Sequence, residues 1–348
     1  MKRIFDSIKK FIKENYKGIL ILVFIYLLFN TKLLSFSSLL FNTKLNFSIY
    51  SPGGLINLDK RITSEDKIYK SSGSINMTYV RLVKGTVPTY LLAKIIPTWD
   101  IIPNDNITYD GDMDETIKID QYYLQESISN AYMVAYNYAN VKYKIKKSNN
   151  YVTYILDNAK TDLKLFDKIE KYDNIDFTNF SKLQEYIKNK NIGDKVDFIV
   201  NRNGRQINCH AELININDEA KIGLTSAVVN DYESDIDISV ISKSSESGSS
   251  GGFMMALAIY NALTKEDITK GSVIAGTGTI DSEGNVGEIG GVTYKLAGAV
   301  KNNSEVMLVP KDNYDEALSY KKKHNFDIEL VSISNFKEAI EYLNNREV

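Results

Sequence analysis

Two short segments of this sequence combine residue types that together can cleave a peptide bond. Residues 247–252 read Ser-Gly-Ser-Ser-Gly-Gly, and residues 289–295 read Ile-Gly-Gly-Val-Thr-Tyr-Lys; each opens an apolar helix candidate. A serine hydroxyl is a poor nucleophile until a base takes its proton, and a neutral lysine amine can be that base. The pattern therefore predicts a serine–lysine dyad.

Ser250 fits the nucleophile and Lys295 fits its base. Burial of Lys295 among apolar neighbours would lower the pKa of its amine, because desolvation disfavours the ammonium form. Gly251 and Gly252 follow the serine, so backbone N–H groups at the helix start would hold an oxyanion. Thr277, on a glycine-flanked strand, is the expected hydroxyl that orients the lysine.

The alternative at this point is that the same residues have no catalytic role. Residues 242–250 are rich in serine and resemble a flexible linker, and a lysine on a helix is usually solvated. Two observations favour chemistry instead. The serine run ends abruptly in an apolar helix, and the downstream segment 276–298 is crowded with glycines, as tight turns between two catalytic segments require.

Strands and helices alternate from residue 221 onward, which indicates a mixed fold of the α+β or α/β class. The patterns predict strands over 222–229, 236–241, 272–280, 305–310 and 327–331, and helices over 253–263, 292–301, 314–323 and 336–344. Earlier in the chain, residues 74–83 read as a strand, 90–96 as a helix or strand, 103–116 as a loop and 116–140 as a long amphipathic helix.

The stretch between these parts has a different character and predicts a small β-rich module. Residues 151–156, 163–169, 196–200 and 206–213 read as strands, and 180–189 as a short helix. The dipeptide Asn203-Gly204 is a type I′ hairpin signal.

Composition excludes several classes of function. The chain has 348 residues, 43% of them hydrophobic, and a formal net charge of −2, which gives no nucleic-acid footprint. The lone Cys209 rules out an intramolecular disulfide and a cysteine metal cage, and His210 and His324 alone make a poor catalytic or metal set. No phosphate-binding P-loop motif occurs. We therefore expect no cofactor, no metal and no nucleic acid.

The N-terminus carries a membrane signal. Residues 1–17 are rich in lysine, residues 18–29 are apolar, and the wider window 18–42 holds a single charge, Lys32. We expect a single-pass anchor over 18–42, with the N-terminus cytoplasmic and the catalytic part extracellular by the positive-inside rule. A cleaved signal peptide is the alternative, although no A-x-A site follows the run.

The catalytic segments resemble the proteolytic domain of Lon-type serine proteases. Residues 248–252 resemble the family's G-P-S-A-G turn, residues 276–295 its T-G…I-G-G-x-x-x-K segment, and residues 309–311 its V-P-K. The resemblance implies that Ser250 is the nucleophile, rather than Ser249, that Lys295 is the general base, and that Thr277 orients it. Gly248, Ser249 and Gly251 then have supporting places in the turn.

A wider resemblance covers most of the chain. Residues 125–127, Gln-Glu-Ser, resemble a helix of the Lon domain, so the β-rich module looks inserted. The whole is similar to the membrane-anchored PDZ-Lon proteases of Gram-positive bacteria. This implies an α+β fold with a basic tail (1–17), an anchor (18–42), an N-terminal part of the protease domain (43–141), a PDZ-like module (142–214) and a Lon-type catalytic domain (215–348). By resemblance the chain forms a homo-oligomer, a hexamer, and cleaves exported peptides or unfolded proteins without ATP.

Departures from the family pattern support a second hypothesis. Ser249 replaces the usual proline, Gly251 the usual alanine, and Ser247 an aspartate that some relatives carry. The turn Leu163–Asp167 replaces L-x-x-G-D, and no clear carboxylate-binding loop precedes it. The alternative is therefore a catalytically weak or inactive, membrane-anchored protein that binds peptides or acts as a scaffold.

Overall fold

The computed structural model describes residues 15–23, 26, 43, 45–104, 113–178 and 180–347. The chain divides into two compact units, Met1–Ser51 with Arg81–Thr108 and Pro52–Val80 with Tyr109–Val348. Strands β1 (Phe47–Asn57) and β3 (Ser74–Lys84) contribute residues to both units.

The predicted anchor over 18–42 lies mostly outside the described residues. Residues 15–23 are helical. Within the described part of the chain, no helix combines the length and apolar character that a membrane crossing requires.

The smaller unit is built from the start of β1, the end of β3, α3 (Val87–Ile95) and β4 (Asp100–Pro103). Strand β1 pairs antiparallel with β4 over Phe47–Tyr50. The ambiguous segment 90–96 is largely helical because Thr86 and Thr89 form a reciprocal capping box and Pro88 lies in the first turn. Pro97 follows the helix and prevents its continuation.

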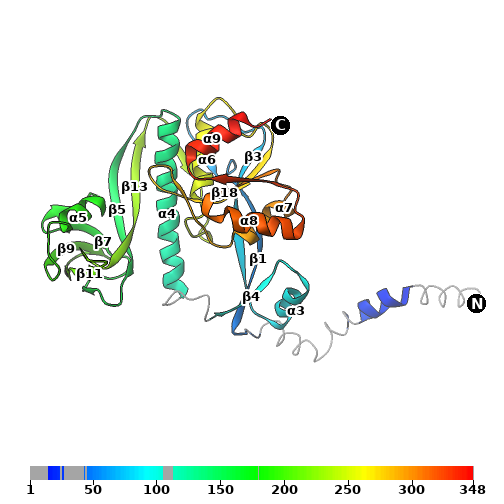
Figure 1. Ribbon diagram of the computed structural model, residues 1–348, viewed down its shortest axis with the longest axis horizontal. Helices are drawn as coiled ribbons and strands as arrows, with labels where there is room; N and C mark the ends of the chain where they lie inside the picture. The colour runs from blue at the N-terminus through cyan, green and yellow to red at the C-terminus, as the bar shows by residue number, and fades with distance from the viewer. Residues whose placement is uncertain are drawn as a thin grey trace, which may run out of the picture. The chain divides into compact units, whose positions relative to one another are not determined.

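The larger unit contains parallel strands in the order β19 (Glu329–Ile333), β18 (Val306–Pro310), β15 (Val273–Gly276) and β3, with parallel pairing between each of these neighbours. Figure 1 labels β3 and β18. Every residue of β18 is buried, as expected for a strand covered on both faces. Val306 and Leu308 join one hydrophobic core, and Met307 and Val309 join another, because successive side chains point to opposite faces.

Helices therefore cover both faces of this sheet. One core contains residues of α4, α6 and α9, and the other contains residues of α7 and α8. The elements are α4 (Met113–Tyr138), α6 (Gly252–Leu263), β15 (Val273–Gly276), α7 (Val292–Lys301), β18 (Val306–Pro310), α8 (Lys311–His324), β19 (Glu329–Ile333) and α9 (Phe336–Asn345). Two small ribbons add β2 (Ile62–Ser64) with β14 (Ile238–Val240), and β16 (Thr279–Ile280) with β17 (Val286–Gly287).

The strand predicted over 272–280 is wrong in its length. The pairing of β15 ends at Gly276, and β16 begins at Thr279. Between them the backbone N–H of Thr277 donates to Leu308 O, and that of Gly278 donates to Ser250 O at 2.8 Å. The Thr277 N–H still binds β18, and the chain leaves the sheet at Gly278 because the N–H of that residue binds the serine segment instead.

The β-rich module has its own sheet, in the order β13-β5-β7-β9-β10-β6, and its own core around Val152, Leu183 and Phe198. Its elements are β5 (Tyr143–Ile155), β6 (Lys160–Thr161), β7 (Lys168–Tyr172), β8 (Ile175–Asp176), α5 (Phe180–Ile187), β9 (Lys195–Arg202), β10 (Arg205–Glu212), β11 (Ile214–Ile216), β12 (Glu219–Lys221) and β13 (Leu224–Ser234). The predicted limits of 142 and 214 stay predictions; the sheet itself continues to Ser234.

Two turns of the module have residues in the left-handed backbone region, one with a sequence suited to it and one without. Asn203 and Gly204 have φ of 54° and 81°, as a type I′ hairpin turn requires, so this prediction is confirmed. Phe166, where the family pattern has glycine, is held at φ 70°, in the left-handed region that a bulky side chain rarely adopts.

A long ribbon joins the module to the rest of its unit. Strands β5 and β13 pair antiparallel from Leu224↔Ile155 to Ser234↔Tyr143, and the ribbon lies along α4 (Figure 1). The backbone N–H of Val228 donates to Glu126 Oε1 at 2.9 Å, and that of Asn230 donates to Ser129 Oγ at 3.0 Å. Helix α4 thus contacts the module's ribbon directly.

Candidate active site

The serine segment forms a tight turn at the start of α6. Gly248 has φ 87°, which favours glycine, and its N–H donates to Asp120 O at 2.9 Å. Helix α6 begins at Gly252 after Gly251 as N-cap, and Ser250 is half-buried. The predicted nucleophile therefore lies immediately before a buried helix, as the sequence indicates.

Helix α4, which contains Asp120, holds this turn at a second point. The Ser127 hydroxyl, 2% exposed, donates to Ser249 O at 2.9 Å. A Cβ atom added at Gly252 would overlap Ser127 Oγ, and one at Gly251 would lie 2.6 Å from Met77 Sδ. The close approach of α4 therefore requires glycine at position 252, and the carbonyl before Ser250 is fixed by a buried donor.

Lys295 lies one turn into α7, which begins after Gly291 in the left-handed conformation. The side chain is 3% exposed, and its Nζ donates to Thr277 Oγ1 at 3.1 Å. Burial lowers the pKa of the amine to about 8. A lysine with this pKa is partly neutral near physiological pH, which is the form that accepts a proton.

Thr277 joins the two predicted catalytic segments. Its hydroxyl accepts from Lys295 Nζ and donates to Ser250 O at 3.0 Å, and the Thr277 side chain is fully buried. The Gly278 N–H donates to the same carbonyl. A continuous hydrogen-bonded chain thus runs from the lysine amine to the backbone of the serine, which is the geometry that a lysine-orienting threonine needs.

Two further side chains fix the site, and sequence reasoning assigned them no role. Asn313, 2% exposed, accepts from the Ile289 N–H at 2.9 Å and donates to Ile289 O at 3.0 Å, which holds the loop before α7. Ser127 holds the serine turn as described above. The Gln-Glu-Ser resemblance pointed to the helix of Ser127 but not to its contact, and no signal pointed to Asn313.

The histidines and the cysteine take no part in this arrangement. His210 forms an exposed pair with Asp162, with Nδ1 to Oδ2 at 3.2 Å, and His324 packs against Tyr320 and Phe326. Cys209 is buried within the module. In the part of the chain that the structure describes, no group of three or more acidic, histidine or cysteine side chains is arranged to hold a metal.

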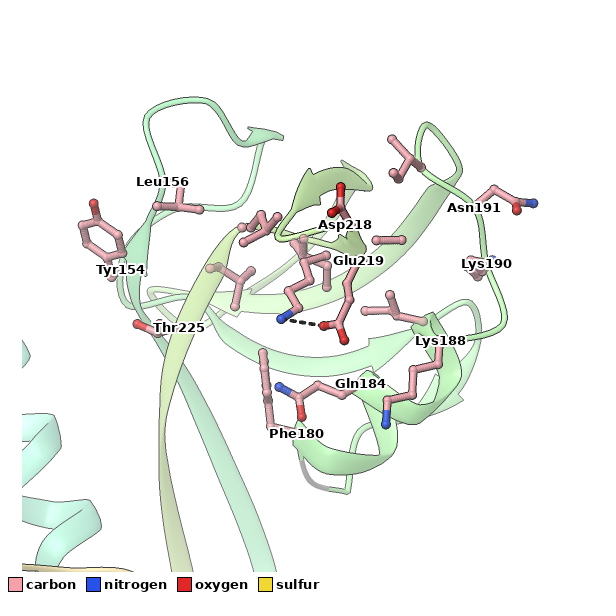
Figure 2. Close-up of a pocket in the computed structure, with 18 residues that line it drawn as sticks. Tyr154, Leu156, Phe180, Gln184, Lys188, Lys190, Asn191, Asp218, Glu219 and Thr225 are labelled. Carbon is pink, nitrogen blue, oxygen red and sulfur yellow. Dashed lines mark ion pairs between the residues drawn. The ribbon is translucent and has the colours of Figure 1, made fainter. Parts of the chain in front are cut away.

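A groove of about 820 Å³ lies in the β-rich module (Figure 2). One wall is α5, with Phe180 and Gln184, and Lys188 directly after it; another is the segment from Ala220 to Thr225, which runs from the end of β12 into the start of β13. Lys221 Nζ and Glu219 Oε2 form an ion pair at 2.8 Å on its surface. No residue of the serine or lysine segments lines this groove.

Comparison with known proteins identifies the C-terminal part of the chain. Residues 218–345 match the family model of the Lon protease (S16) C-terminal proteolytic domain. Ser250, Thr277 and Lys295 lie within this range, whereas α4 lies before it. A 71-residue stretch is 37% identical to the archaeal Lon protease of Halobacterium salinarum. That stretch is 20% of this chain and 10% of the relative, so the chain spans about a tenth of the relative it matches.

Two solved structures are similar to a part of the chain. One is the PDZ domain of the SdrC-like protein of Listeria monocytogenes, at 22% identity and a TM-score of 0.22, covering 24% of this chain and 92% of that one. The other is the second domain of a Listeria protein, at 22% identity and a TM-score of 0.21, covering 24% and 87%. The PDZ-like nature of the module stays a prediction.

Proposed function

We propose that this chain is an ATP-independent serine endopeptidase, in which Ser250 and Lys295 form the catalytic dyad. One observation carries the proposal: a buried lysine with a lowered pKa is hydrogen-bonded through Thr277 to the serine's own backbone. The match of residues 218–345 to the Lon proteolytic domain supports the same reaction class.

The reaction follows from the roles of these groups. Neutral Lys295 takes the proton of the Ser250 hydroxyl as its Oγ attacks the carbonyl carbon of a peptide bond. Backbone N–H groups at the serine turn stabilise the resulting oxyanion. The Gly252 and Phe253 N–H groups donate to Ser249 O and Gly278 O, so those of Ser250 and Gly251 are the proposed donors.

The remaining steps return the enzyme to its starting state. The Lys295 ammonium gives its proton to the leaving amine, and the C–N bond breaks to leave an acyl ester on Ser250. Lys295, again neutral, takes a proton from a water that attacks this ester. The acid product leaves, and the Ser250 hydroxyl recovers its proton from Lys295.

The proposal includes the cellular setting that the N-terminal sequence indicates. The basic residues 1–17 and the apolar window 18–42 favour a single-pass anchor, with the catalytic region outside the cell. Exported peptides or unfolded proteins are then the substrates, since the sequence has no P-loop motif for an ATP-driven unfoldase. Assembly into a homo-oligomer, a hexamer by resemblance, is part of the same proposal.

Hydrolysis of an unstructured peptide library by the full chain in detergent, without ATP, tests the dyad. We expect cleavage by the wild type, none by Ser250→Ala or Lys295→Ala, and covalent labelling by a fluorophosphonate that Ser250→Ala abolishes. Ser249→Ala is the matched control, because it removes the adjacent hydroxyl while leaving the labelling site. Labelling lost in Ser249→Ala and kept in Ser250→Ala would shift the nucleophile by one residue.

The second candidate function is peptide binding by the module, with weak or no catalysis. The groove beside the start of β13 favours it, because β13 stands at the end of the strand order, where an extended peptide can add a strand. Binding of library peptides by Ser250→Ala, with no cleavage by the wild type under any condition, would favour this function over the first.

A further inference from the structure

Helix α3, Val87–Ile95, exposes an apolar surface to solvent. Leu91, Leu92 and Ile95 are 56%, 44% and 76% exposed, and no residue of the helix is buried. Leu82, on the adjoining end of β3, is 46% exposed. Leu91 and Ile95 are four residues apart and Leu92 and Ile95 three apart, so these side chains are neighbours on the helix. Large apolar side chains exposed together mark a site of contact with a partner or a membrane rather than with water alone. We call these four side chains the α3 surface.

The charges around this surface are mainly positive. In residues 81–104 the basic side chains are Arg81, Lys84 and Lys94, and Asp100 is the only acidic one. Lys94 Nζ lies 5.4 Å from the centroid of the Tyr90 ring, so its aliphatic stem runs along the same helix. Apolar side chains with basic and aromatic neighbours suit the interface of a membrane that contains anionic lipids.

Chain length keeps α3 close to the proposed anchor. Four residues separate Asn42, the end of the predicted anchor, from Phe47. The five residue steps between them span at most about 17 Å when extended. Phe47 begins β1, its ring centroid lies 5.7 Å from that of Tyr90, and its carbonyl accepts from the Gly85 N–H at 3.0 Å. An anchor that ends at the bilayer surface therefore holds α3 within reach of that surface.

We propose that the α3 surface docks on the lipid bilayer and gives the chain a second contact with the membrane, beside the anchor. This inference rests on the anchoring part of the proposed function and is independent of catalysis. A peripheral contact of this kind would limit how far the smaller unit moves from the bilayer.

Trp99 provides a direct test because it is the chain's only tryptophan and its backbone N–H donates to Ile96 O, directly after α3. The full chain would be placed in phosphatidylcholine vesicles with phosphatidylglycerol, with and without brominated acyl chains. We expect brominated lipid to quench Trp99 emission, and quenching to weaken when phosphatidylglycerol is omitted. Flotation of the vesicles reports anchoring separately.

Three variants separate docking from anchoring and from misfolding. Combined Leu91→Gln, Leu92→Gln and Ile95→Gln should lose most of the quenching while the chain still floats. Methionine at the same three positions keeps the surface apolar and should retain quenching. Ile175→Gln, which changes an exposed isoleucine of the module, is the matched control and should also retain it. Circular dichroism checks that each variant folds.

Several outcomes would overturn the inference. Wild-type emission unaffected by brominated lipid would do so, as would equal quenching of the wild type and the triple glutamine variant. A triple variant that changes only the self-association of the chain would assign the surface to a second copy instead. A chain that does not float would remove the anchor, and this proposal with it. Quenching without any peptidase activity would leave the docking proposal standing and reject the dyad.

Discussion

The proposed catalytic region, which holds Ser250, Thr277 and Lys295, and the β-rich module each bury an ionisable side chain, but only the module pairs that side chain with an opposite charge. Asp167 of the module is 0% exposed and accepts from Arg202 Nε at 2.7 Å and Nη2 at 2.6 Å. Lys295 is 3% exposed, and among the described residues it forms no ion pair; its recorded side-chain partner is the neutral Thr277 hydroxyl. The charge of Asp167 is balanced by the guanidinium of Arg202. The Lys295 amine has no counter-ion in the described part of the chain, so it becomes neutral by losing its proton more readily.

The buried ion pair of Asp167 and Arg202 suits a structural role, whereas the unpaired Lys295 amine suits the role of a base. A buried ion pair keeps both partners charged, and the hydrogen bond to Asp167 raises the pKa of Arg202 further. A buried amine without a counter-ion has its pKa lowered, which yields a base near neutral pH at a cost in stability. The five predictions below test this contrast and the contacts that position Lys295 and the serine turn.

The largest effect is expected from removing the dyad. Ser250→Ala and Lys295→Met should each lower kcat by at least about 10³-fold, because neither residue of such a unit functions alone. The wild-type rate should rise with pH through about 8, as Lys295 loses its proton. Measurement of kcat from pH 6 to 10 checks both. A flat pH profile would mean that another group is the base.

Lys295→Met should also stabilise the fold at neutral pH. Because burial lowers the lysine pKa from 10.5 to about 8, the unfolded chain binds the proton more tightly than the folded chain. Unfolding free energy therefore rises with pH between about 8 and 10.5. The variant should lose this slope and gain about 3 kcal/mol below pH 8. Urea unfolding at pH 7 and 10 measures it; destabilisation at pH 7 would contradict the unpaired charge.

Removing a charged side chain from the module should lower stability instead of raising it. Arg202→Met leaves the Asp167 carboxylate buried without its ion-pair partner and should destabilise the module by about 3–5 kcal/mol. The double variant Arg202→Met with Asp167→Leu should recover much of the lost stability. Thermal unfolding of the single and double variants measures both changes. Equal stability of Arg202→Met and the wild type would show that the carboxylate is solvated after all.

A smaller effect is expected at Thr277. Thr277→Val keeps the shape of the side chain but removes the hydroxyl between Lys295 Nζ and Ser250 O. Loss of a buried partner costs about 1–3 kcal/mol, which corresponds to a fall of about 5- to 150-fold in kcat. Thr277→Ser should restore most of the rate. If Val and Ser variants are equally active, the hydroxyl does not position the lysine.

The smallest effect is expected at Ser127. Ser127→Ala removes the donor to Ser249 O and should lower kcat by about 5- to 10-fold with KM little changed. Gly252→Ala alone should be far more damaging, because its Cβ overlaps Ser127 Oγ. The double variant removes that overlap, so a double-mutant cycle should give a strongly favourable coupling. Additive effects would mean that the two positions do not meet.

Local pattern was enough to predict most elements of the catalytic region. The helix predicted over 292–301 has those bounds because Gly291 precedes its first residue and an apolar stripe follows. Helix α4 begins at Met113, within a segment predicted as loop, since the acidic residues that suggested a loop, Asp114 and Glu115, lie in its first turn, where they suit the helix dipole. Periodicity therefore located the elements better than it located their ends.

Contacts between distant segments could not be predicted in the same way. Ser250, Thr277 and Lys295 were found because their residue types carry a recognisable chemistry. Ser127 and Asn313 are ordinary polar residues in the sequence, and their importance comes only from which carbonyl or N–H group the fold places beside them. The break in the strand at Thr277 has the same origin, because it depends on the backbone of the serine turn.

The pairing of β5 with β13 has a consequence for how this chain can change. Tyr143 and Ser234, where the intervening domain leaves and rejoins the polypeptide, are direct partners in one ladder. In topology the module is therefore an insertion at the tip of the hairpin that β5 and β13 form. A deletion that replaces it with a two-residue turn would preserve the strand register and the bonds from β13 to α4. The module and the region that holds Ser250 and Lys295 can accordingly be exchanged as separate parts.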